Sequence, residues 1–515
     1  MAVSPADPVP HRMLITLCTV CATLMQALDQ TIANVALPYM QGSLSASYDE
    51  ITWVLTSYIT AAAIMTAPVG WLAARFGRKY LYIVCLIGFT ATSVMCGAAQ
   101  SLMQVVIFRI LQGMFGAALV PLSQSTMMDI YPTEKRGQAM AIWGMGVMIG
   151  PILGPTLGGY LTELYNWRFV FYINIPFGIL ATVGLILFMP RSHPNFNMKF
   201  DWIGFGVLSL GIGSLQLMLD RGGDQDWFTS REIVVEAVLG ALGVYLFVVH
   251  MLTADRPFIP PAMFNNRNFS AGAAMMFAAG TILVSSSSLM APWLQNLANY
   301  PVEAAGLIMA PRGIGTMCAM LIGGRLAAKI DPRKIMACGI TMLICSIWEM
   351  THWTPDVAQS RIVGTIVFQG MGLGFLFIPL QVIAFATLPA QYRTDGASLF
   401  SLSRNIGAAI GVSVTSFMLS HNTQTLHAEI GSSVTPFNRA LFNSSTVEHV
   451  WNPLTHRGAA LLDRVVNQQA QIIAFIDDYR MMIFTTMPAL ALLLLMRRPR
   501  TAPRPAPEDS HAAMD

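Results

Sequence analysis

Long apolar runs alternate with short polar segments along almost the whole chain. A helix needs about 20 predominantly apolar residues to cross the hydrocarbon core of a bilayer. Because most of these runs reach or approach that length and hold few charges, the pattern predicts an all-α integral membrane protein. The predicted membrane-spanning segments number fourteen and cover residues 13–37, 51–73, 80–99, 103–127, 138–161, 167–189, 202–219, 231–252, 270–293, 304–325, 335–352, 361–387, 396–419 and 478–496.

The composition agrees with a bilayer protein, since 54% of the 515 residues are hydrophobic and only 11% are charged. The first apolar run lacks a small-residue cleavage site, so we expect a retained helix and not a signal peptide. The sequence also lacks the phosphate-binding loop, the zinc-protease motif and the nucleophile elbow of common enzymes, which argues against an enzyme. Energy for transport would therefore come from an ion gradient or from the substrate's own gradient.

The cysteines all fall inside predicted spanning segments. Cys18 and Cys21 have the spacing of a metal motif, but no histidine or acidic partner lies near them, so packing is the expected role. The sequence therefore predicts no disulfide framework, no metal and no cofactor. The seven positions are Cys18, Cys21, Cys85, Cys96, Cys318, Cys338 and Cys345.

Cations are distributed unevenly among the loops. When the N-terminus is placed in the cytoplasm, all five lysines and most loop arginines fall on the inner side. Since cytoplasmic loops are rich in Lys and Arg, both termini are expected inside, with a cytoplasmic segment at 1–12 and a disordered cytoplasmic tail at 497–515. The net charge of +3 reflects this topology and indicates no nucleic-acid partner.

The chain contains an internal repeat. The segment "GWLAARFGRK" (70–79) after the second spanning segment returns as "GRLAAKIDPRK" (324–334) after the tenth. We therefore predict two pseudo-symmetric six-helix bundles, at 13–189 and 256–496, joined by a linker at 190–255 that adds two inserted helices. Two such bundles that rock about a shared central site are typical of alternating-access transporters.

Several motifs resemble those of a known family. The segments "LDQTIANVALP" (28–38), "GWLAARFGRK" (70–79), "RILQGMFGAA" (109–118) and "GPILGPTLGG" (150–159) are similar to the signature motifs of drug:proton antiporters of the major facilitator superfamily. The fourteen-segment arrangement is similar to that of the bacterial EmrB-type multidrug exporters. The resemblance implies a major facilitator fold and proton-coupled export of lipophilic drugs across the bacterial inner (cytoplasmic) membrane.

The resemblance also implies partners and motif residues. A periplasmic EmrA-type adaptor and a TolC-type outer-membrane channel would complete a tripartite efflux pump, and the adaptor would meet the external loop expected at 420–477. Four histidines in that loop are spread too widely for a metal site. The positions that the resemblance assigns to gating or to the antiporter motifs are Gly70, Arg75, Arg78, Gly146, Gly150, Pro151, Gly154, Pro155, Gly158, Gly159 and Arg404.

Asp29 and Arg109 are ionisable residues inside spanning segments. From the helical rise, Asp29 lies about 12 Å and Arg109 about 9 Å from the outer face, so the two share a depth. Such residues usually face a partner or an interior cavity. Desolvation favours the neutral acid of Asp29 and a nearby arginine favours its carboxylate. We predict that Asp29 exchanges protons and that Arg109 tunes or relays the exchange; the alternative is a static ion pair between two helices.

Glycines recur every fourth residue in the fifth segment, at Gly146, Gly150, Gly154 and Gly158, with Pro151 and Pro155 between them. A stripe of small residues lets a neighbouring helix approach closely, and prolines loosen the backbone hydrogen bonds. Tight packing alone explains the stripe equally well. In the resembled family this motif is associated with antiporters, so export follows from the resemblance and not from the spacing.

Other polar residues at membrane depth are candidates for the substrate cavity. Arg312 would bind an anionic substrate or extend to the outer interface, whereas Arg404 is expected near the inner side, in contact with a cytoplasmic loop. Buried amides between helices also serve as simple helix contacts. The 34 methionines suit a cavity of adaptable shape, or an ordinary membrane core. The candidate cavity residues are Gln26, Gln112, Gln124, Arg312 and Gln381.

Three functions remain open at this point. The first is a proton-driven exporter of lipophilic drugs, and the second is a proton-linked exporter of an endogenous metabolite. The third is a membrane scaffold or channel without coupled transport. Only a coupled carrier would keep its fold and lose uphill transport when Asp29 is replaced. Substrate identity would distinguish the first function from the second.

Overall fold

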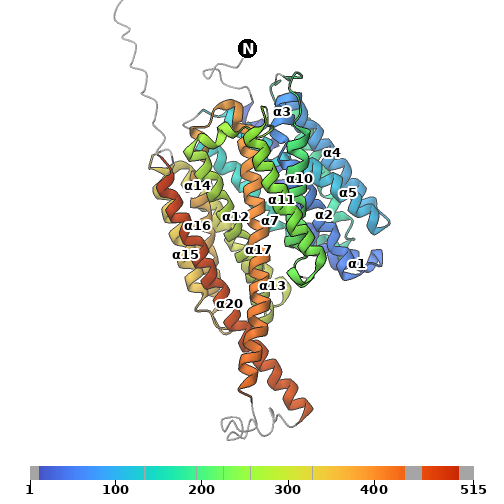
Figure 1. Cartoon of the computed structure of the whole chain (residues 1–515), viewed down its shortest axis with the longest axis vertical. Helices are drawn as coiled ribbons and strands as arrows, with labels where there is room; N and C mark the ends of the chain where they lie inside the picture. Colours follow the sequence, from blue (N-terminus) through green and yellow to red (C-terminus); the bar gives the residue numbers. More distant parts are fainter. Residues whose placement is uncertain are drawn as a thin grey trace, which may run out of the picture.

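The computed structural model describes residues 11–132, 135–192, 194–223, 225–255, 257–327, 329–434 and 455–497. Within these residues the fold is helical and contains no β-strand. The helices lie side by side in one bundle, and two of them project from its lower end (Figure 1). We call the end at which α1 begins the N-terminal face and the other end the opposite face.

The first half of the bundle follows the first six predicted segments. Its second segment bends by 57° between α2 and α3. Pro68, which lacks a backbone N–H and disfavours helix continuation, is the N-cap of α3 at this bend. The helices are α1 (Arg12–Leu44), α2 (Tyr48–Thr66), α3 (Val69–Phe76), α4 (Arg78–Ala98), α5 (Leu102–Gly116), α6 (Leu119–Ile130), α7 (Arg136–Leu164), α8 (Phe169–Tyr172) and α9 (Asn174–Phe188).

The second half follows the last six segments, after an inserted pair of helices. The inserted helices are α10 (Trp202–Arg221) and α11 (Arg231–Thr253), with the short η2 (Trp227–Thr229) between them. The second half comprises η3 (Pro261–Asn265), α12 (Arg267–Pro292), η4 (Trp293–Leu297), α13 (Val302–Met309), α14 (Pro311–Leu326), α15 (Pro332–Met350), α16 (Gln359–Ala386), η5 (Ala390–Tyr392), α17 (Arg393–Ser432) and α20 (His456–Leu495).

All fourteen predicted segments coincide with a helix or a pair of consecutive helices in the described part of the chain. Eleven of the described helices are long and apolar enough to span a membrane, or up to twelve if the bent pair α2 and α3 is one span. The helices α15 and α17 do not meet that criterion. Arg333, Lys334 and Glu349 near the ends of α15, and Arg404 with several serines in α17, lower their apolarity.

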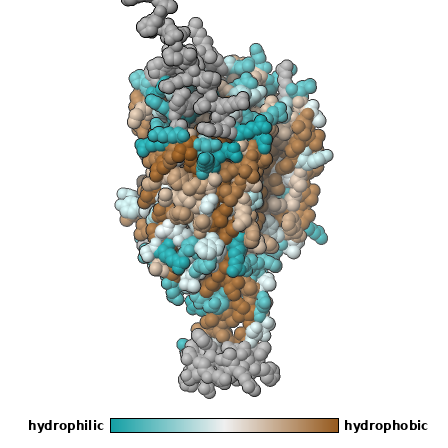
Figure 2. Space-filling view, turned by 90° about the vertical axis from the view of Figure 1, so that its left-hand side faces the viewer, coloured by the Kyte–Doolittle hydropathy of each residue, from teal (hydrophilic) through white to brown (hydrophobic). Residues whose placement is uncertain are grey.

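The molecular surface fits a membrane. On the face in view, Figure 2 shows a broad apolar belt across the middle of the bundle, with polar residues gathered above and below it. Large apolar side chains of the helices, such as Leu187, Tyr245 and Phe484, are more than 60% exposed. Because water penalises such a continuous apolar surface and lipid does not, the belt indicates the part of the protein that the bilayer covers.

The inserted helices α10 and α11 pack on each other, and α10 also contacts α2 and α17. Ile212 of α10 joins Ala63 of α2 and Leu402 of α17 in one apolar cluster. The inserted pair therefore contacts both halves of the bundle. The division of the chain into two six-helix bundles stays a prediction from the repeat.

The segment 420–477, expected as an external loop, is helical at both ends. α17 continues to Ser432 and α20 already begins at His456. These helix ends form the projection below the bundle (Figure 1), where His427 lies 2.8 Å from Asp463. The centre of the expected loop, 435–454, lies outside the described residues, as do the ends 1–10 and 498–515.

Candidate functional site

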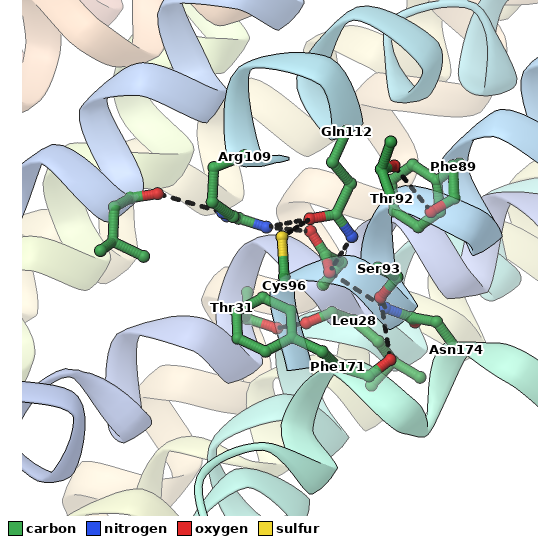
Figure 3. Close-up of polar contacts among 12 residues, drawn as sticks. Leu28, Thr31, Phe89, Thr92, Ser93, Cys96, Arg109, Gln112, Phe171 and Asn174 are labelled. Carbon is green, nitrogen blue, oxygen red and sulfur yellow. Dashed lines mark hydrogen bonds and ion pairs between the residues drawn. The ribbon is translucent and has the colours of Figure 1, made fainter. Parts of the chain in front are cut away.

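Asp29 and Arg109 meet in the core of the first half. The Arg109 Nη1 atom lies 2.7 Å from the Asp29 Oδ2 atom, and both side chains are fully buried. The second carboxylate oxygen accepts hydrogen bonds from Gln112 Nε2 at 2.8 Å and from Asn174 Nδ2 at 3.0 Å. The charge pair is thus embedded in a network from α1, α5 and α9 (Figure 3). The shared depth expected from the sequence becomes direct contact.

The Arg109 guanidinium is fixed from several sides. Its Nε donates to the Val54 carbonyl oxygen at 3.0 Å, and its Nη1 also donates to Gln112 Oε1 at 2.9 Å. The guanidinium carbon lies 4.1 Å from the centre of the Tyr58 ring, a cation–π contact that compensates part of the lost hydration. Its Nη2 has no partner among the described residues. Arg109 therefore retains one free donor.

Two buried donors of this network were not predicted. Asn174 is fully buried at the start of α9 and also donates to Ser93 Oγ at 3.0 Å. Ser93 in turn donates to the Phe171 carbonyl oxygen at 2.8 Å. Both contacts are drawn in Figure 3. Asn174 therefore holds one oxygen of Asp29 in place, and Ser93 orients the Asn174 side chain.

Asn174→Ala will reduce stability by about 1–3 kcal/mol, because it removes a donor from a buried charged group. The expected measurement is a lower midpoint of thermal unfolding of the purified protein in detergent. Asn34→Ala is the matched control, since Asn34 lies on the same helix as Asp29 but is exposed. Equal midpoints for both variants would show that Asn174 does not stabilise the Asp29 carboxylate.

The glycine stripe of α7 contacts α1, the helix that carries Asp29. A Cβ at Gly150 would lie 2.6 Å from the Ala27 carbonyl carbon, and one at Gly158 would lie 3.0 Å from Ile32. The Thr31 hydroxyl donates to the Gly150 carbonyl oxygen at 3.2 Å. A Cβ at Gly146 would contact Val20 and one at Gly154 would contact Thr31, both on α1. A Cβ at Gly159 would meet nothing within 4 Å.

The prolines of this motif leave the helix intact. The helix α7 continues through positions 151 and 155. The stripe therefore allows close packing of α7 on α1 beside the buried charge pair.

A cavity of about 1300 Å³ lies between the two halves. Gln26, Tyr58 and Arg109 line it from the first half, and Arg312 and Arg404 line it from the second. It reaches the opposite face, where Trp227 and Gln424 line it. The apolar residues that line the cavity include Met148, Met309, Phe377 and Phe417.

The glutamines predicted for the substrate cavity lie in different places. Gln26 lines the cavity as predicted, but Gln112, Gln124 and Gln381 do not line it in the described part of the chain. Gln112 belongs to the Asp29 network. Gln124 donates to Gln381 at 3.4 Å and joins α6 to α16 one helical turn beyond the lining residues Val120 and Phe377. This amide pair closes the cavity toward the N-terminal face.

Arg312 and Arg404 both face the cavity. Arg312 donates to Ser286 Oγ at 2.7 Å and to Ser287 Oγ at 2.6 Å. Arg404, which was expected to contact a cytoplasmic loop, lines the cavity instead, because α17 carries it well inside the bundle. Among the described residues no carboxylate forms an ion pair with either arginine.

Charged contacts close the N-terminal face between the halves. Asp129 of α6 pairs with Arg78 of α4 and with Arg393 of α17, the latter at 2.6 Å. Arg78 also donates to Thr394 at 3.2 Å. Gly70 packs on Asp395, whose Cα would lie 2.8 Å from a Cβ at position 70. Two of the predicted motif residues thus lie where the halves meet.

Arg75, the third predicted motif residue of the segment 70–79, has a different contact. Its guanidinium donates to the Phe196 carbonyl oxygen at 2.9 Å and to that of Met198. Both acceptors belong to the linker between the halves. Arg75 therefore holds the linker against α3 and does not cross to the second half.

Asp129→Asn will weaken both ion pairs and favour opening of the N-terminal face by about 1–2 kcal/mol, which is roughly tenfold in the opening equilibrium. We expect faster hydrogen exchange at the start of α17, measured by mass spectrometry. The control is Asp463→Asn on the opposite face, where the carboxylate is 68% exposed. Unchanged exchange in Asp129→Asn would mean that these pairs do not hold the halves together.

Comparison with known proteins identifies the family. The sequence pattern of the Major Facilitator Superfamily matches residues 19–412. The multidrug export protein EmrB of Haemophilus influenzae is 36% identical over 428 residues, which cover 83% of this chain and 84% of that protein. The fatty acid resistance protein FarB of Neisseria gonorrhoeae is 32% identical over 462 residues, which cover 89% and 91%.

Solved structures confirm the fold. The proton:xylose symporter XylE, a major facilitator superfamily protein, aligns with a TM-score of 0.58 at 14% identity and covers 92% of this chain and 96% of its own. Identity this low supports the fold alone, whereas the two curated relatives extend over most of both sequences. The chain therefore belongs to the major facilitator superfamily, and within it to the family of the EmrB multidrug export proteins.

Proposed function

We propose that this protein exports lipophilic small molecules in exchange for protons by alternating access. The observation that carries the proposal is the buried ion pair of Asp29 and Arg109 beside a cavity between the two halves. Intramembrane charges of this kind mark proton relays and substrate pathways in transporters. Arg109 lines the cavity, so a molecule bound there lies next to the charge pair.

The coupling step follows from the contacts of Asp29. A proton taken up by the carboxylate removes the charge that attracts Arg109, and it converts one acceptor oxygen into a donor. The network of Gln112 and Asn174 must then rearrange, and α1 moves with it. Because the glycine stripe of α7 packs on α1, α7 moves with α1, and α7 also contacts α14 in the second half. Protonation of Asp29 is thereby linked to the relative position of the halves.

The observed state exposes the cavity to the opposite face, while Asp129 and the pair of Gln124 and Gln381 close the N-terminal face. We assign the N-terminal face to the cytoplasm, because the predicted loops on that side carry the lysines. The chain would then lie in the bacterial inner membrane with both termini inside. The observed state would be the one that releases substrate outward and takes up a proton.

The cavity suits lipophilic substrates of drug size. Its volume of about 1300 Å³ exceeds that of most small-molecule sites. Methionine and aromatic side chains such as Met148, Met309 and Phe377 line it, and thioethers adapt to ligands of different shape. The names of the relatives, which concern multidrug export and fatty acid resistance, support the same substrate class.

The proposed partners belong to the opposite face. The projecting ends of α17 and α20 would meet a periplasmic EmrA-type adaptor that leads to a TolC-type outer-membrane channel. The protein would then be the inner-membrane component of a tripartite efflux pump. Support for this assembly comes from the similarity to EmrB and from the position of the projection beyond the apolar belt (Figure 2).

The test uses purified protein in liposomes with an imposed pH gradient and a lipophilic fluorescent drug. We expect uphill drug movement whose direction reverses when the gradient is reversed, and none when the gradient is dissipated. Drug movement that does not depend on the pH gradient would contradict proton coupling. Proton flux driven by a cellular metabolite, with no response to any drug, would favour the metabolite exporter instead.

A further inference from the structure

The last membrane helix buries a carboxylate that the mechanism above does not use. Asp478 of α20 is fully buried, and neither of its carboxylate oxygens has a hydrogen-bond partner among the described residues. Its neighbour Asp477 is 40% exposed and pairs with Arg480 at 3.1 Å. Because an ionised carboxylate without donors is very costly inside a protein, the surroundings of Asp478 favour its neutral form.

Asp478 lies at membrane depth inside the second half. It precedes the end of α20 at Leu495 by about 26 Å of helical rise, within a hydrocarbon core of about 30 Å. The helix α20 packs against α12, α15 and α17. Among the described residues, no cationic side chain forms an ion pair or a hydrogen bond with Asp478, so none neutralises its ionised form in place.

Other buried polar groups near Asp478 also lack partners. The Tyr479 hydroxyl and the Ser285 hydroxyl of α12 are buried and form no hydrogen bond with described residues. Tyr479 interacts electrostatically with both Asp478 and Arg312. Arg312 has serine partners but no carboxylate in the described part of the chain. The surroundings of Tyr479 therefore include a carboxyl group and a cation that has no carboxylate partner in the described part of the chain.

A second cavity lies one helical turn from Asp478. It has a volume of about 230 Å³ and lies between α12, α17 and α20. Ser285 lines it from α12, and Met481 and Met482, which follow Asp478 by one turn, line it from α20. This space is large enough for several water molecules. Water there would connect the Asp478 acid to the free Ser285 hydroxyl.

We propose that Asp478 is a second transported-proton site, so that two protons enter for each drug molecule exported. The proton on Asp29 is required for the change between states, and the proton on Asp478 adds to the driving force. This inference rests on the proposed proton-coupled export. In the observed state Asp29 forms an ion pair with Arg109, whereas Asp478 is buried without a partner among the described residues, which favours the neutral acid. When Asp478 releases its proton in another state, the unneutralised Arg312 compensates the new charge.

The test measures how far drug accumulates in liposomes at a fixed pH difference, with the membrane potential held at zero. At equilibrium each exchanged proton contributes about tenfold of drug gradient per pH unit. At a pH difference of about one unit, wild type therefore reaches about 100-fold and Asp478→Asn about 10-fold. Asp477→Asn is the matched control and behaves as wild type. An Asp478→Asn protein that still reaches about 100-fold overturns the proposal, as does a wild type limited to about 10-fold.

A second measurement needs no variant and covers the case that Asp478→Asn does not fold. Saturating drug is added to wild type in detergent, and released protons are counted with an indicator dye in weak buffer. Two protons per bound drug are expected, and one would overturn the proposal. Absence of any uphill drug transport by wild type would instead refute the proposed function itself, so the two failures are distinguishable.

Discussion

Arg109→Leu will destabilise the protein by about 3–5 kcal/mol, because it leaves the Asp29 carboxylate buried without its charge partner. The pair lies in a fully buried network, where the remaining donors Gln112 and Asn174 cannot replace the lost positive charge. The loss of Arg109 also removes the contact with Tyr58 and the hydrogen bond that Arg109 Nε donates to the Val54 carbonyl oxygen. We expect a sharp fall in the midpoint of thermal unfolding in detergent.

The double variant Asp29→Leu with Arg109→Leu separates folding from coupling. Replacing both members of a buried ion pair with apolar residues is often neutral for stability. We therefore expect the double variant to recover most of the stability and to show no uphill transport. If the double variant still drives drug uphill, the pair is a static structural contact, and coupling depends on other residues.

Gly150→Ala will disrupt the packing of α7 on α1 and abolish most transport. The added Cβ would lie 2.6 Å from the Ala27 carbonyl carbon and 2.8 Å from the Leu28 nitrogen, both backbone atoms that cannot rotate away. Overpacking of this kind costs about 1–3 kcal/mol. It also displaces α1 two residues before Asp29, so the geometry of the charge pair changes as well.

Gly159→Ala is the control for this prediction, because a Cβ at that position meets nothing within 4 Å. Alanine is a better helix former than glycine by about 1 kcal/mol, so this variant should be as stable as wild type or more stable. The measurement is the thermal midpoint together with the initial rate of drug transport. Equal thermal midpoints and equal transport rates of Gly150→Ala and Gly159→Ala would mean that the glycine stripe does not determine the packing of α7 on α1.

Much of the fold was predictable because few backbone structures can span a bilayer. A spanning helix must satisfy its backbone internally and must be long enough to cross the core, so each apolar run indicates one crossing. The pairing of Asp29 with Arg109 was predictable for a similar reason. Two opposite charges at one depth in a medium of low polarity must lie close together.

Other site residues gave weaker signals. Asn174 and Ser93 are single polar residues in apolar runs, and such residues also occur as simple helix contacts. Whether an amide faces the cavity or a neighbouring helix depends on helix rotation and tilt. For that reason Gln26 lines the cavity whereas Gln124 and Gln381 bind each other. Asp129 lies at the boundary of a loop, where most carboxylates are merely solvated.

Asp478 was missed for a different physical reason. Asp477 and Asp478 mark the point where the hydropathy of the last apolar run begins to rise, so the sequence indicates a helix that starts there. The helix instead begins at His456, and its first half, which is polar, is continuous with the apolar second half. Asp478 is therefore in the middle of α20 and is covered by neighbouring helices, although its sequence neighbours are polar.

The most direct test of the central claim compares wild type with Asp29→Asn in liposomes under an imposed pH gradient. Asparagine keeps the shape of the side chain and can still contact Arg109 and Gln112, but it cannot take up a proton. The account predicts that wild type accumulates drug against its gradient, whereas Asp29→Asn only equilibrates drug across the membrane. Uphill accumulation by Asp29→Asn equal to that of wild type would contradict the assignment of Asp29 to the proton path.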